Sequence, residues 1–485
     1  MIRLKDILKT TEHQLISGDA DMQINQIQFD SRKIKTGDVF VAIKGTQVDG
    51  HDFIDTAIKL GACAIVFEET PAEMISNVCY IKSKQAAKSL ALMAAEFYGN
   101  PTQSFKLIGV TGTNGKTTVV SLLYKLFKDL GYKCGLLSTI RVMIDDEEIH
   151  ATHTTPDSLQ LNQLFRQMAD QDCSYCFMEV SSHAIDQFRI EGLQFNGALF
   201  TNITHDHLDY HKTFDNYIKT KKRFFDELPK DAFAVINKDD KNGQIMVQNT
   251  VAKVTYYAIK SQATVKTRII ECDLSGLHLQ LDQKDFYTNK VGRFNAYNLT
   301  AVYSTAQLLG IDDESILKAL SMPHAVDGRF ELIYKHPAFK AIVDYAHTPD
   351  ALENVIETIN DLKKKNERLI TVFGCGGNRD KSKRPVMGRI ASTKSDLVFI
   401  TSDNPRNEEP MAIIQEIEQG VPEKLASKCI SISDRENAIK TACLMANPND
   451  IILVAGKGHE TYQEINGAKN HFDDKEILIK YLKEL

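Results

Sequence analysis

The sequence contains no long hydrophobic run. Hydrophobic residues make up 43% of the 485 positions. No uninterrupted apolar stretch approaches the roughly 18 residues that a membrane-spanning helix needs. The first ten residues, MIRLKDILKT, are charged and amphipathic, and they lack the apolar core of a signal peptide. The sequence therefore predicts a cytoplasmic protein with no membrane partner.

A large excess of one charge is also missing. The chain has 58 basic and 64 acidic residues, which gives a formal net charge of −6, and the two signs are interspersed. Such a balance provides no general attraction to nucleic acid or to anionic membranes. We expect small-molecule substrates, no nucleic-acid partner and a monomeric protein.

The cysteines form no recognisable framework. Nine cysteines are scattered through the chain, an odd number that suits reduced thiols in a cytoplasm. The one close pair, Cys173 and Cys176, has neither a second CxxC pair nor a nearby histidine pair at zinc spacing. Cys176 lies in the strand-like run CFMEV, which favours a buried thiol over a redox or metal role.

The most informative stretch that is present is LIGVTGTNGKTT, at 107–118. An apolar run leads into a glycine-bearing turn, and apolar residues at helical spacing follow. In such a strand–turn–helix unit, backbone N–H groups and the helix N-terminus attract phosphate, the lysine reaches the β- and γ-phosphates, and the threonine hydroxyl ligates Mg²⁺. Val110 departs from the general pattern, which has glycine there. The predicted nucleoside-triphosphate site comprises Gly112, Thr113, Asn114, Gly115, Lys116, Thr117 and Thr118.

The length and the order of the predicted elements indicate an α/β protein of three domains. Residues 1–98 are typical of a small mixed α/β domain. Residues 99–333 alternate strands and helices, as a parallel sheet requires, and carry the phosphate loop. The βα pattern restarts in residues 334–485, which we interpret as a second doubly wound, Rossmann-like domain.

Polar clusters follow three strand-like runs of the central domain. Ligands of open parallel sheets bind beyond the carboxyl ends of the strands, so these clusters should converge on the phosphate loop. Glu179 ends an apolar strand and is a natural Mg²⁺ ligand, because this cation prefers oxygen. His207 is a second candidate for the metal. A histidine that satisfies backbone groups at a strand end fits the same residue equally well.

Four strand ends of the last domain also carry polar runs, DYAH at 344–347, GCGGNRD at 374–380, SDNPR at 402–406 and AGKGHE at 455–460. Asp, His, Arg and Glu side by side predict a recognition surface for a polar zwitterion. The run GCGGNRD matches a dinucleotide-binding turn only weakly, because arginine replaces its last glycine. The structural alternative is helix capping, which we expect of Asp350 and Asp434 because helical stretches follow them.

Together and in order, the motifs TGTNGKTT, HTTPDS, EVSSHAIDQFR, NITHDHLDYH, GRFE, DYAHTP, GCGGNRDKSKRP, SDNPR and AGKGHE resemble those of the Mur ligases. The resemblance covers all three expected domains, and the phosphate loop of this family has the form found here. It implies a uridine-nucleotide-binding N-terminal domain, a central ATPase and a C-terminal domain that receives an amino acid. The implied reaction is ATP-dependent addition of an amino acid to UDP-N-acetylmuramoyl-L-alanyl-D-glutamate, a step in peptidoglycan synthesis.

The resemblance also implies roles for residues whose local sequence is ambiguous. Contacts with the uridine nucleotide would come from Phe29, Ser31, Thr46, Gln47 and Val48. The rest of that substrate would be held by Thr154, Thr155, Ser181, Gln187 and Arg189. Asn295, Arg329, Asp344 and His347 would help to bind ATP. Taken alone, Ser31 reads as an ordinary turn residue.

A lysine carbamylated by CO₂ is a further feature of the family, and it maps to Lys221 from the spacing after Tyr217. The residues alone do not distinguish Lys221 from Lys219 and Lys222, which are typical of a charged helix face. A buried lysine loses its proton readily, and only the neutral amine takes up CO₂. The resulting carboxylate would help to hold Mg²⁺ beside the other metal ligands.

The choice of amino acid rests on the run Asp403, Asn404, Pro405 and Arg406. An arginine binds a carboxylate in bidentate fashion, and meso-diaminopimelate has a second carboxylate that lysine lacks. In this family DNPR accompanies meso-diaminopimelate. The resemblance completes the pocket with Arg379, Gly456 and Glu460, in which Glu460 would pair the distal ammonium. A lysine-adding version of the same ligase is the alternative.

The expected mechanism activates a carboxylate by phosphorylation. The D-glutamate γ-carboxylate attacks the γ-phosphate of ATP, and the α-amine of the incoming amino acid then displaces phosphate from the acyl phosphate. Folylpolyglutamate synthetase is the nearest alternative among enzymes, and DNPR and HTTPDS argue against it. A nucleotide-switched binding protein is the alternative from another class. The polar strand ends of the last domain argue against that reading.

Overall fold

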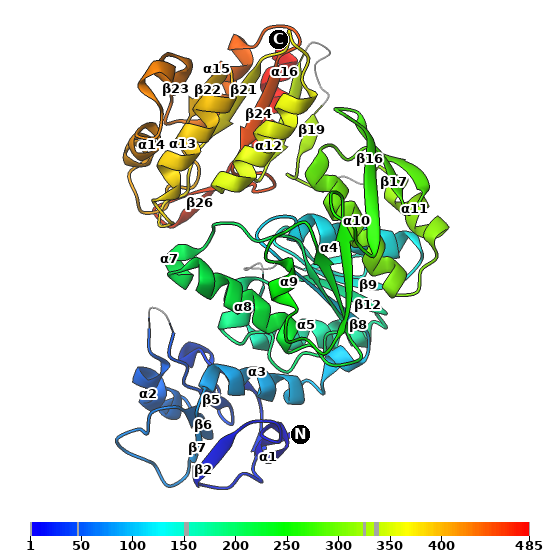
Figure 1. Ribbon diagram of the computed structural model, residues 1–485. Coiled ribbons are helices and arrows are strands. Elements are labelled where there is room, and N and C mark those ends of the chain that lie inside the picture. Colours follow the sequence, from blue (N-terminus) through cyan, green and yellow to red (C-terminus); the bar gives the residue numbers. More distant parts are fainter. Residues whose placement is uncertain (1, 46–47, 150–154, 324–325, 334–338, 485) are drawn as a thin grey trace.

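The computed structural model describes residues 2–45, 48–149, 155–323, 326–333 and 339–484. The chain forms three parts stacked one above the other, each with its own sheet (Figure 1). The N-terminal part lies at one end, and the C-terminal part lies at the other, across the central part. The three-part α/β architecture expected from the sequence is confirmed.

The N-terminal part is built on a five-stranded sheet in the order β2-β7-β6-β5-β4. Its strands run parallel except β2, which pairs antiparallel with β7 at one edge. The strands of this part are β1 (Ile2–Arg3), β2 (His13–Ser17), β3 (Gln23–Ile24), β4 (Ile27–Gln28), β5 (Val39–Val41), β6 (Ala64–Phe67) and β7 (Cys79–Ser83). The helices are α1 (Leu4–Ile7), α2 (Ile54–Lys59) and α3 (Ala86–Phe97).

The central part carries an 11-stranded sheet in the order β11-β10-β9-β12-β8-β13-β14-β15-β16-β17-β18. Strands β9 to β16 of this order are parallel. The parallel strands are β8 (Lys106–Thr111), β9 (Cys134–Leu137), β12 (Tyr175–Glu179), β13 (Gly197–Phe200), β14 (Phe233–Asn237), β15 (Lys253–Ala258) and β16 (Val265–Asp273). The phosphate loop therefore follows an interior strand of a parallel sheet. The sequence predicted the parallel sheet and the strand before the loop.

Antiparallel strands extend this sheet at both edges. They are β10 (Val142–Ile144), β11 (Glu147–Ile149), β17 (Gly276–Leu281) and β18 (Lys284–Thr288). The expectation of a purely alternating parallel βα domain was incomplete here. The edge strands are joined by short turns, which only antiparallel neighbours allow.

Helices cover both faces of the central sheet. Alternate residues of β12 show this, because Phe177 packs in one core with α4 and α10, whereas Cys176 and Met178 pack in the other with α5 and α8. Cys176 is fully buried, as expected. The helices are α4 (Lys116–Asp129), α5 (Ser158–Asp170), α6 (Ser182–Asp186), α7 (Leu208–His211), α8 (Phe214–Asp226), α9 (Gly243–Met246), α10 (Arg293–Leu308) and α11 (Asp313–Ser321).

The C-terminal part has a six-stranded sheet in the order β19-β20-β24-β21-β22-β23, parallel except for β19. Its strands are β19 (Glu331–Ile333), β20 (Lys340–Asp344), β21 (Leu369–Phe373), β22 (Leu397–Ile400), β23 (Cys429–Ser431) and β24 (Ile451–Ala455). A separate hairpin joins β25 (Tyr462–Ile465) to β26 (Ala468–His471). Strand β19 belongs to this sheet although it precedes residue 334, where we expected the domain to begin.

Helices lie on both faces of this sheet too, as in a doubly wound fold. Helices α12 (Pro349–Leu362), α13 (Lys383–Lys394) and α14 (Pro410–Glu418) share one core with the sheet. Helices α15 (Arg435–Met445) and α16 (Asp474–Glu484) share the other. The carboxyl ends of the parallel strands therefore carry the loops that bear the polar motifs.

Candidate functional site

A cavity of about 980 Å³ lies between the central and C-terminal parts. Its walls come from the loop after β8, from the ends of β12 and β13, and from the residues that follow β20, β21, β22 and β24. Strand ends of two sheets thus meet at one site. The predicted residues that line it are the phosphate loop from Gly112 to Thr118, Thr155, Glu179, Ser181, Arg189, His207, Lys221, Arg329, Asp344, His347, Arg379, Asp403, Asn404, Arg406, Gly456 and Glu460.

The phosphate loop has the backbone that its glycines allow. Gly112 and Gly115 have φ of 152° and 88°, in the region that favours glycine. A Cβ atom at Gly112 would stand 1.9 Å from Thr201 Oγ1. The Nζ of Lys116 donates to the carbonyl oxygens of Gly112 and Thr113, each at 2.9 Å. The lysine therefore lies over the loop, where a phosphate would be held.

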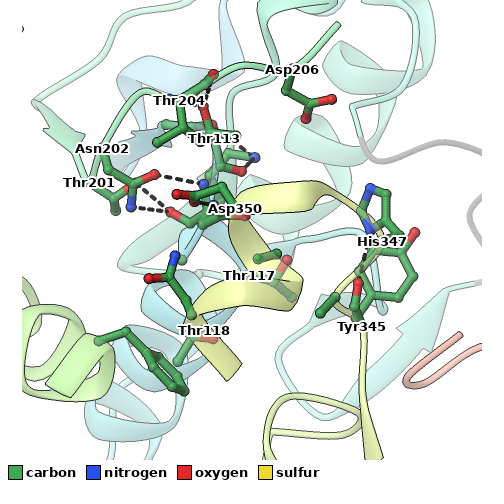
Figure 2. Close-up of a pocket in the computed structure, with 18 of the residues that line it drawn as sticks. Thr113, Thr117, Thr118, Thr201, Asn202, Thr204, Asp206, Tyr345, His347 and Asp350 are labelled. Carbon is green, nitrogen blue, oxygen red and sulfur yellow. Dashed lines mark hydrogen bonds between the residues drawn. The ribbon is translucent and has the colours of Figure 1, made fainter. Parts of the chain in front are cut away.

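Residues after β13 hold this loop in place through hydrogen bonds. Asn202 Oδ1 accepts from the Asn114 amide at 2.9 Å, and Thr201 Oγ1 donates to the Asn114 carbonyl at 2.6 Å. The Thr204 amide donates to Thr113 Oγ1 at 3.0 Å. Figure 2 shows these contacts converging on the loop from one side. The sequence placed this run near the loop but did not predict that its side chains shape it.

Asp350 contributes to the site in a way that we did not predict. Helix α12 is capped by Thr348, whose Oγ1 accepts from the Ala351 amide at 3.3 Å, so the assignment of Asp350 as the cap was wrong. Asp350 Oδ2 instead accepts from Asn114 Nδ2 at 2.6 Å. This contact joins the C-terminal part to the phosphate loop. Asp434, in contrast, caps α15 as expected.

Two side chains with oxygen atoms that can bind a metal ion line the cavity, at the positions expected for metal ligands. Glu179 is buried, and its carboxylate accepts from the Thr139 amide at 2.7 Å and from Thr139 Oγ1 at 3.2 Å. Thr117, whose hydroxyl is the second such group, is in the first turn of helix α4 and lines the cavity. Among the described residues, no group of three or more His, Cys, Asp or Glu side chains is placed to hold a metal ion. A Mg²⁺ ion here would therefore depend on phosphate oxygens for most of its ligands.

His207 is in a strained backbone conformation, and 40% of its side chain is exposed. Its φ is 54°, the left-handed region, and it forms the N-cap residue of α7. Its ring packs edge-on against His183, with 4.9 Å between the ring centroids. Burial lowers the pKa of His207 to about 3, against the attraction of Asp206. The imidazole is therefore neutral near pH 7, and one ring nitrogen retains a free electron pair that can bind a metal ion.

Lys221 is the buried lysine on α8, with 1% of its surface exposed. Its Nζ donates to Thr111 Oγ1 at 3.2 Å and to the Gly112 carbonyl at 3.0 Å. Burial and the nearby Lys116 charge hold the pKa of Lys221 well below its usual range. The neighbours differ, because Lys219 is exposed and Lys222 is paired with Asp226 at 2.6 Å.

Three of the four residues expected around ATP line the cavity, and one does not. Arg329 lies 4.4 Å from the Tyr345 ring centroid and donates through Nη2 to Thr117 Oγ1. Burial raises the pKa of Asp344 to about 6 and lowers that of His347 to about 4. Asn295 does not line the cavity. Its side-chain Nδ2 donates to the Val291 carbonyl at 2.8 Å, and Asn298, one helical turn further, lines the cavity instead.

The predicted amino-acid pocket is organised around Asn404. Its Nδ2 donates to Glu460 Oε2 at 2.7 Å, and its Oδ1 accepts from Lys457 Nζ at 3.1 Å. Burial raises the pKa of Glu460, against the attraction of Lys457. Gly456 has φ of 118°, and a Cβ atom there would stand 2.5 Å from Asp403 Oδ2. Pro405 follows in the same loop but does not line the cavity.

The residues expected to bind the uridine nucleotide lie in two places. Thr155 Oγ1 donates to the Glu179 carbonyl at 3.0 Å, and Arg189 Nη1 donates to the Thr155 carbonyl at 2.7 Å. Gln187 Oε1 accepts from the same arginine at 2.6 Å, and Ser181 caps α6. Phe29, Ser31 and Val48 lie in the N-terminal part, away from the cavity. Thr46, Gln47 and Thr154 lie outside the described residues.

A nucleotide-binding loop forms one wall of this cavity, and charged and amide groups suited to an amino acid form the opposite wall. This combination defines the class of the protein as an ATP-dependent, amide-forming ligase. Family models match three segments, the Mur ligase family catalytic domain at 23–98, the Mur ligase middle domain at 110–306 and the Mur ligase glutamate ligase domain at 328–458. The chain belongs to the Mur ligase family.

Individual relatives agree with the family models along the whole chain. A Cytophaga hutchinsonii protein named UDP-N-acetylmuramoyl-L-alanyl-D-glutamate–2,6-diaminopimelate ligase is 53% identical over 100% of both chains. A solved structure of a ligase of that name is 30% identical, with a TM-score of 0.70 over 100% of this chain and 99% of the other. A Mycobacterium tuberculosis folylpolyglutamate synthase structure shares the fold at 18% identity, with a TM-score of 0.61 over 75% of this chain and 91% of the other.

No helix within the described residues is long and apolar enough to span a membrane. This finding agrees with the hydrophobic pattern of the sequence. The longest described helix, α10, has 16 residues and carries its apolar side chains into the core of the central part.

Proposed function

We propose that this protein is the ligase that adds meso-diaminopimelate to UDP-N-acetylmuramoyl-L-alanyl-D-glutamate in peptidoglycan synthesis. One observation carries the proposal. The phosphate loop and Asp403, Asn404 and Arg406 of the DNPR run, which come from different parts of the chain, line the same cavity. Two relatives that carry the name of this activity match 100% and 98% of the chain. We further propose that it acts as a monomer in the cytoplasm.

We propose that the chain brings three substrates together at this cavity. ATP would lie along the phosphate loop, with Arg329 and His347 beside it. The uridine nucleotide would reach from the N-terminal part, near Ser31, to Arg189, so that its terminal carboxylate meets the γ-phosphate. Two substrates held by different parts imply closure around them, which excludes water from a reactive acyl phosphate.

In the first step the γ-carboxylate of D-glutamate would attack the γ-phosphorus, and the bond to the ADP oxygen would break. The ammonium of Lys116 would stabilise the charge on the transferred phosphoryl oxygens. In the second step the α-amine of the amino acid would attack the acyl carbon and release phosphate. Glu460 and Arg406 would hold the distal end of the amino acid, with Glu460 at its ammonium and Arg406 at its second carboxylate.

The donors at the cavity fit Mg²⁺, because a carboxylate and a hydroxyl are the oxygen ligands that it prefers. Glu179, Thr117 and His207 would hold the ion, which would neutralise charge on the triphosphate. We also propose that Lys221 is carbamylated. Its neutral amine is supported by burial, and its Nζ lies among the phosphate-loop oxygens rather than beside a carboxylate.

The proposal is tested by giving purified protein ATP, Mg²⁺ and the uridine-linked dipeptide, together with each candidate amino acid in turn. We expect an amide product and phosphate release with meso-diaminopimelate, and little with lysine. An ¹⁸O label in the substrate carboxylate should appear in the released phosphate. Product with lysine alone would support the lysine-adding alternative, and phosphate release with a folate acceptor would support a folylpolyglutamate synthetase.

A further inference from the structure

The guanidinium of Arg406 is held by the protein at two of its three nitrogens. Nη1 donates to the Gly377 carbonyl at 2.8 Å, and Nε lies 3.3 Å from Glu464 Oε2. Within the part of the chain that the structure describes, Nη2 has no hydrogen-bonded partner. The ion pair is half-buried, with 21% of the Arg406 side chain and 24% of the Glu464 side chain exposed. The contacts leave the Nη2 end of the fork for a ligand.

Glu464 also holds the backbone of Arg406. Arg406 has φ of 52°, a left-handed conformation that costs a non-glycine residue energy and is kept only where neighbours fix it. Its amide donates to the Glu464 carbonyl at 3.0 Å, and its carbonyl accepts from the Asn466 amide at 2.7 Å. The hairpin of β25 and β26 therefore sets both the backbone and the side chain of Arg406.

The pocket and the hairpin meet at this pair. Arg406 lines the cavity, but Glu464 does not. The Glu464 amide also donates to Asn404 Oδ1 at 2.9 Å, and Asn404 donates to Glu460 Oε2. Glu464 is thus connected to both groups that are proposed to hold the distal end of the amino acid.

We propose that Glu464 is a positioning residue for amino-acid specificity. It fixes the guanidinium of Arg406 so that its Nη2 end is presented to the second carboxylate of the substrate. This inference rests on the proposed function, in which Arg406 binds that carboxylate. An arginine that is already ordered loses less conformational freedom when a ligand binds, so preference for a dicarboxylic amino acid depends on Glu464.

The test compares E464A and E464Q in the full-length protein, with KM for meso-diaminopimelate and the kcat/KM ratio of meso-diaminopimelate to lysine as readouts. E464A removes the carboxylate that holds the Arg406 guanidinium. It should raise the KM for meso-diaminopimelate about three- to tenfold, because the arginine side chain must then be ordered when the substrate binds. It should lower the ratio by a similar factor and leave KM for ATP unchanged. E464Q keeps an acceptor oxygen and should show a smaller effect than E464A.

The matched control is E476Q, which changes an exposed glutamate that pairs with His471 of the same hairpin. It should leave every constant unchanged. The double variant R406A/E464A should have the KM of R406A, because Glu464 acts only through the arginine. Thermal unfolding of E464A checks that the hairpin remains folded.

The outcomes separate this inference from the proposed function. If R406A uses meso-diaminopimelate as well as the unsubstituted protein does, the proposed role of Arg406 is wrong, and the inference is wrong with it. If R406A loses preference but E464A leaves or lowers the KM, the inference alone is overturned. An E464A effect of equal size in the R406A background overturns it as well.

Discussion

Arg329 Nη2 donates a hydrogen bond to Thr117 Oγ1 across 3.0 Å. The arginine belongs to the segment just before β19, and the threonine lies in the first turn of the helix that follows the phosphate loop. The guanidinium also packs on the Tyr345 ring, 4.4 Å from its centroid. One side chain therefore connects the start of the C-terminal part to the residue that we propose as a ligand of the metal and a neighbour of the triphosphate.

R329A should raise KM for ATP at least about tenfold, because a hydrogen bond to a charged group is worth about 1.5–3 kcal/mol. KM for the uridine-linked dipeptide should change little. Initial rates at varied ATP concentration measure the effect. R329K is the matched control, since it keeps the charge but not the planar fork, and it should recover part of the loss. An unchanged KM for ATP in R329A would contradict the assignment.

Thr139 holds the carboxylate of Glu179 through both its amide and its hydroxyl. Residues that orient a metal ligand typically change metal affinity or activity by about 10–100-fold when they are substituted. T139V removes the hydroxyl and keeps the amide, so we expect the Mg²⁺ concentration for half-maximal activity to rise about tenfold. T139S keeps the hydroxyl and should resemble the unsubstituted protein. Equal Mg²⁺ dependence in T139V and T139S would show that Glu179 needs no such support.

The phosphate loop was predictable because its information is local. Strand, glycines, lysine and helix are contiguous in 107–118, and the structure forms them in that order. The N-cap of α12 was equally predictable from the local sequence, but we assigned it to the wrong residue. Thr348 is followed by Pro349, and threonine at the N-cap with proline at the first helical position is the favoured arrangement. Asp350 was thereby free to reach Asn114 in another part of the chain.

Lys221 illustrates what the residues alone did not determine. Lys219, Lys221 and Lys222 lie within one turn of α8, and their sequence surroundings are alike. Only packing of that helix against the central sheet makes Lys221 the buried one. The family resemblance pointed to Lys221 but gave no physical reason why this lysine, and not its neighbours, is the buried one. Strands β17 and β18 were missed for a related reason, since a parallel-sheet pattern was extended over residues whose short turns indicate hairpins.

The proposed carbamate on Lys221 should depend on pH in a defined direction. Burial holds the pKa of Lys221 well below its usual range, so the neutral amine that takes up CO₂ is available at a lower pH than it is for an exposed lysine. Acidification through that lowered pKa charges the amine and should remove the carbamate. NMR with ¹³C-bicarbonate should show a carbamate signal near neutral pH that fades in acid. K221M should lack the signal, and a signal that survives in K221M would contradict the assignment.

The lowered pKa of Lys221 also predicts how the free energy of unfolding changes with pH in CO₂-free buffer. The unfolded chain binds the Lys221 proton more tightly than the folded chain does, so the free energy of unfolding should rise with pH between the lowered and the ordinary pKa of lysine. K221M has no such proton. Near pH 7 it should therefore unfold at a higher temperature than the unsubstituted protein while being inactive. A lower unfolding temperature for K221M would show that the amine stabilises the fold.

A buried ion pair behind the amino-acid pocket leads to a prediction on stability and binding together. Arg435 and Asp474 are 2.7 Å apart, and both side chains are 0% exposed. Arg435 also donates to the carbonyls of Ser402, at 3.3 Å, and Ala455, at 3.0 Å. These carbonyls follow or end the strands β22 and β24, which carry the SDNPR and AGKGHE runs. The pair therefore holds the two pocket loops at a fixed separation.

Removal of one partner leaves the other charge buried and unpaired, which costs about 3–5 kcal/mol. D474A should lower the unfolding temperature of the C-terminal part and raise KM for the amino acid more than KM for ATP. The double variant R435M/D474L replaces the pair with apolar groups and should lose less stability than D474A, because no charge is left unpaired. Its KM for the amino acid should nevertheless stay high, since the bonds to both strand ends are gone. Calorimetry and initial rates on the two variants separate these effects, and a double variant less stable than D474A would show that the ion pair itself stabilises the fold.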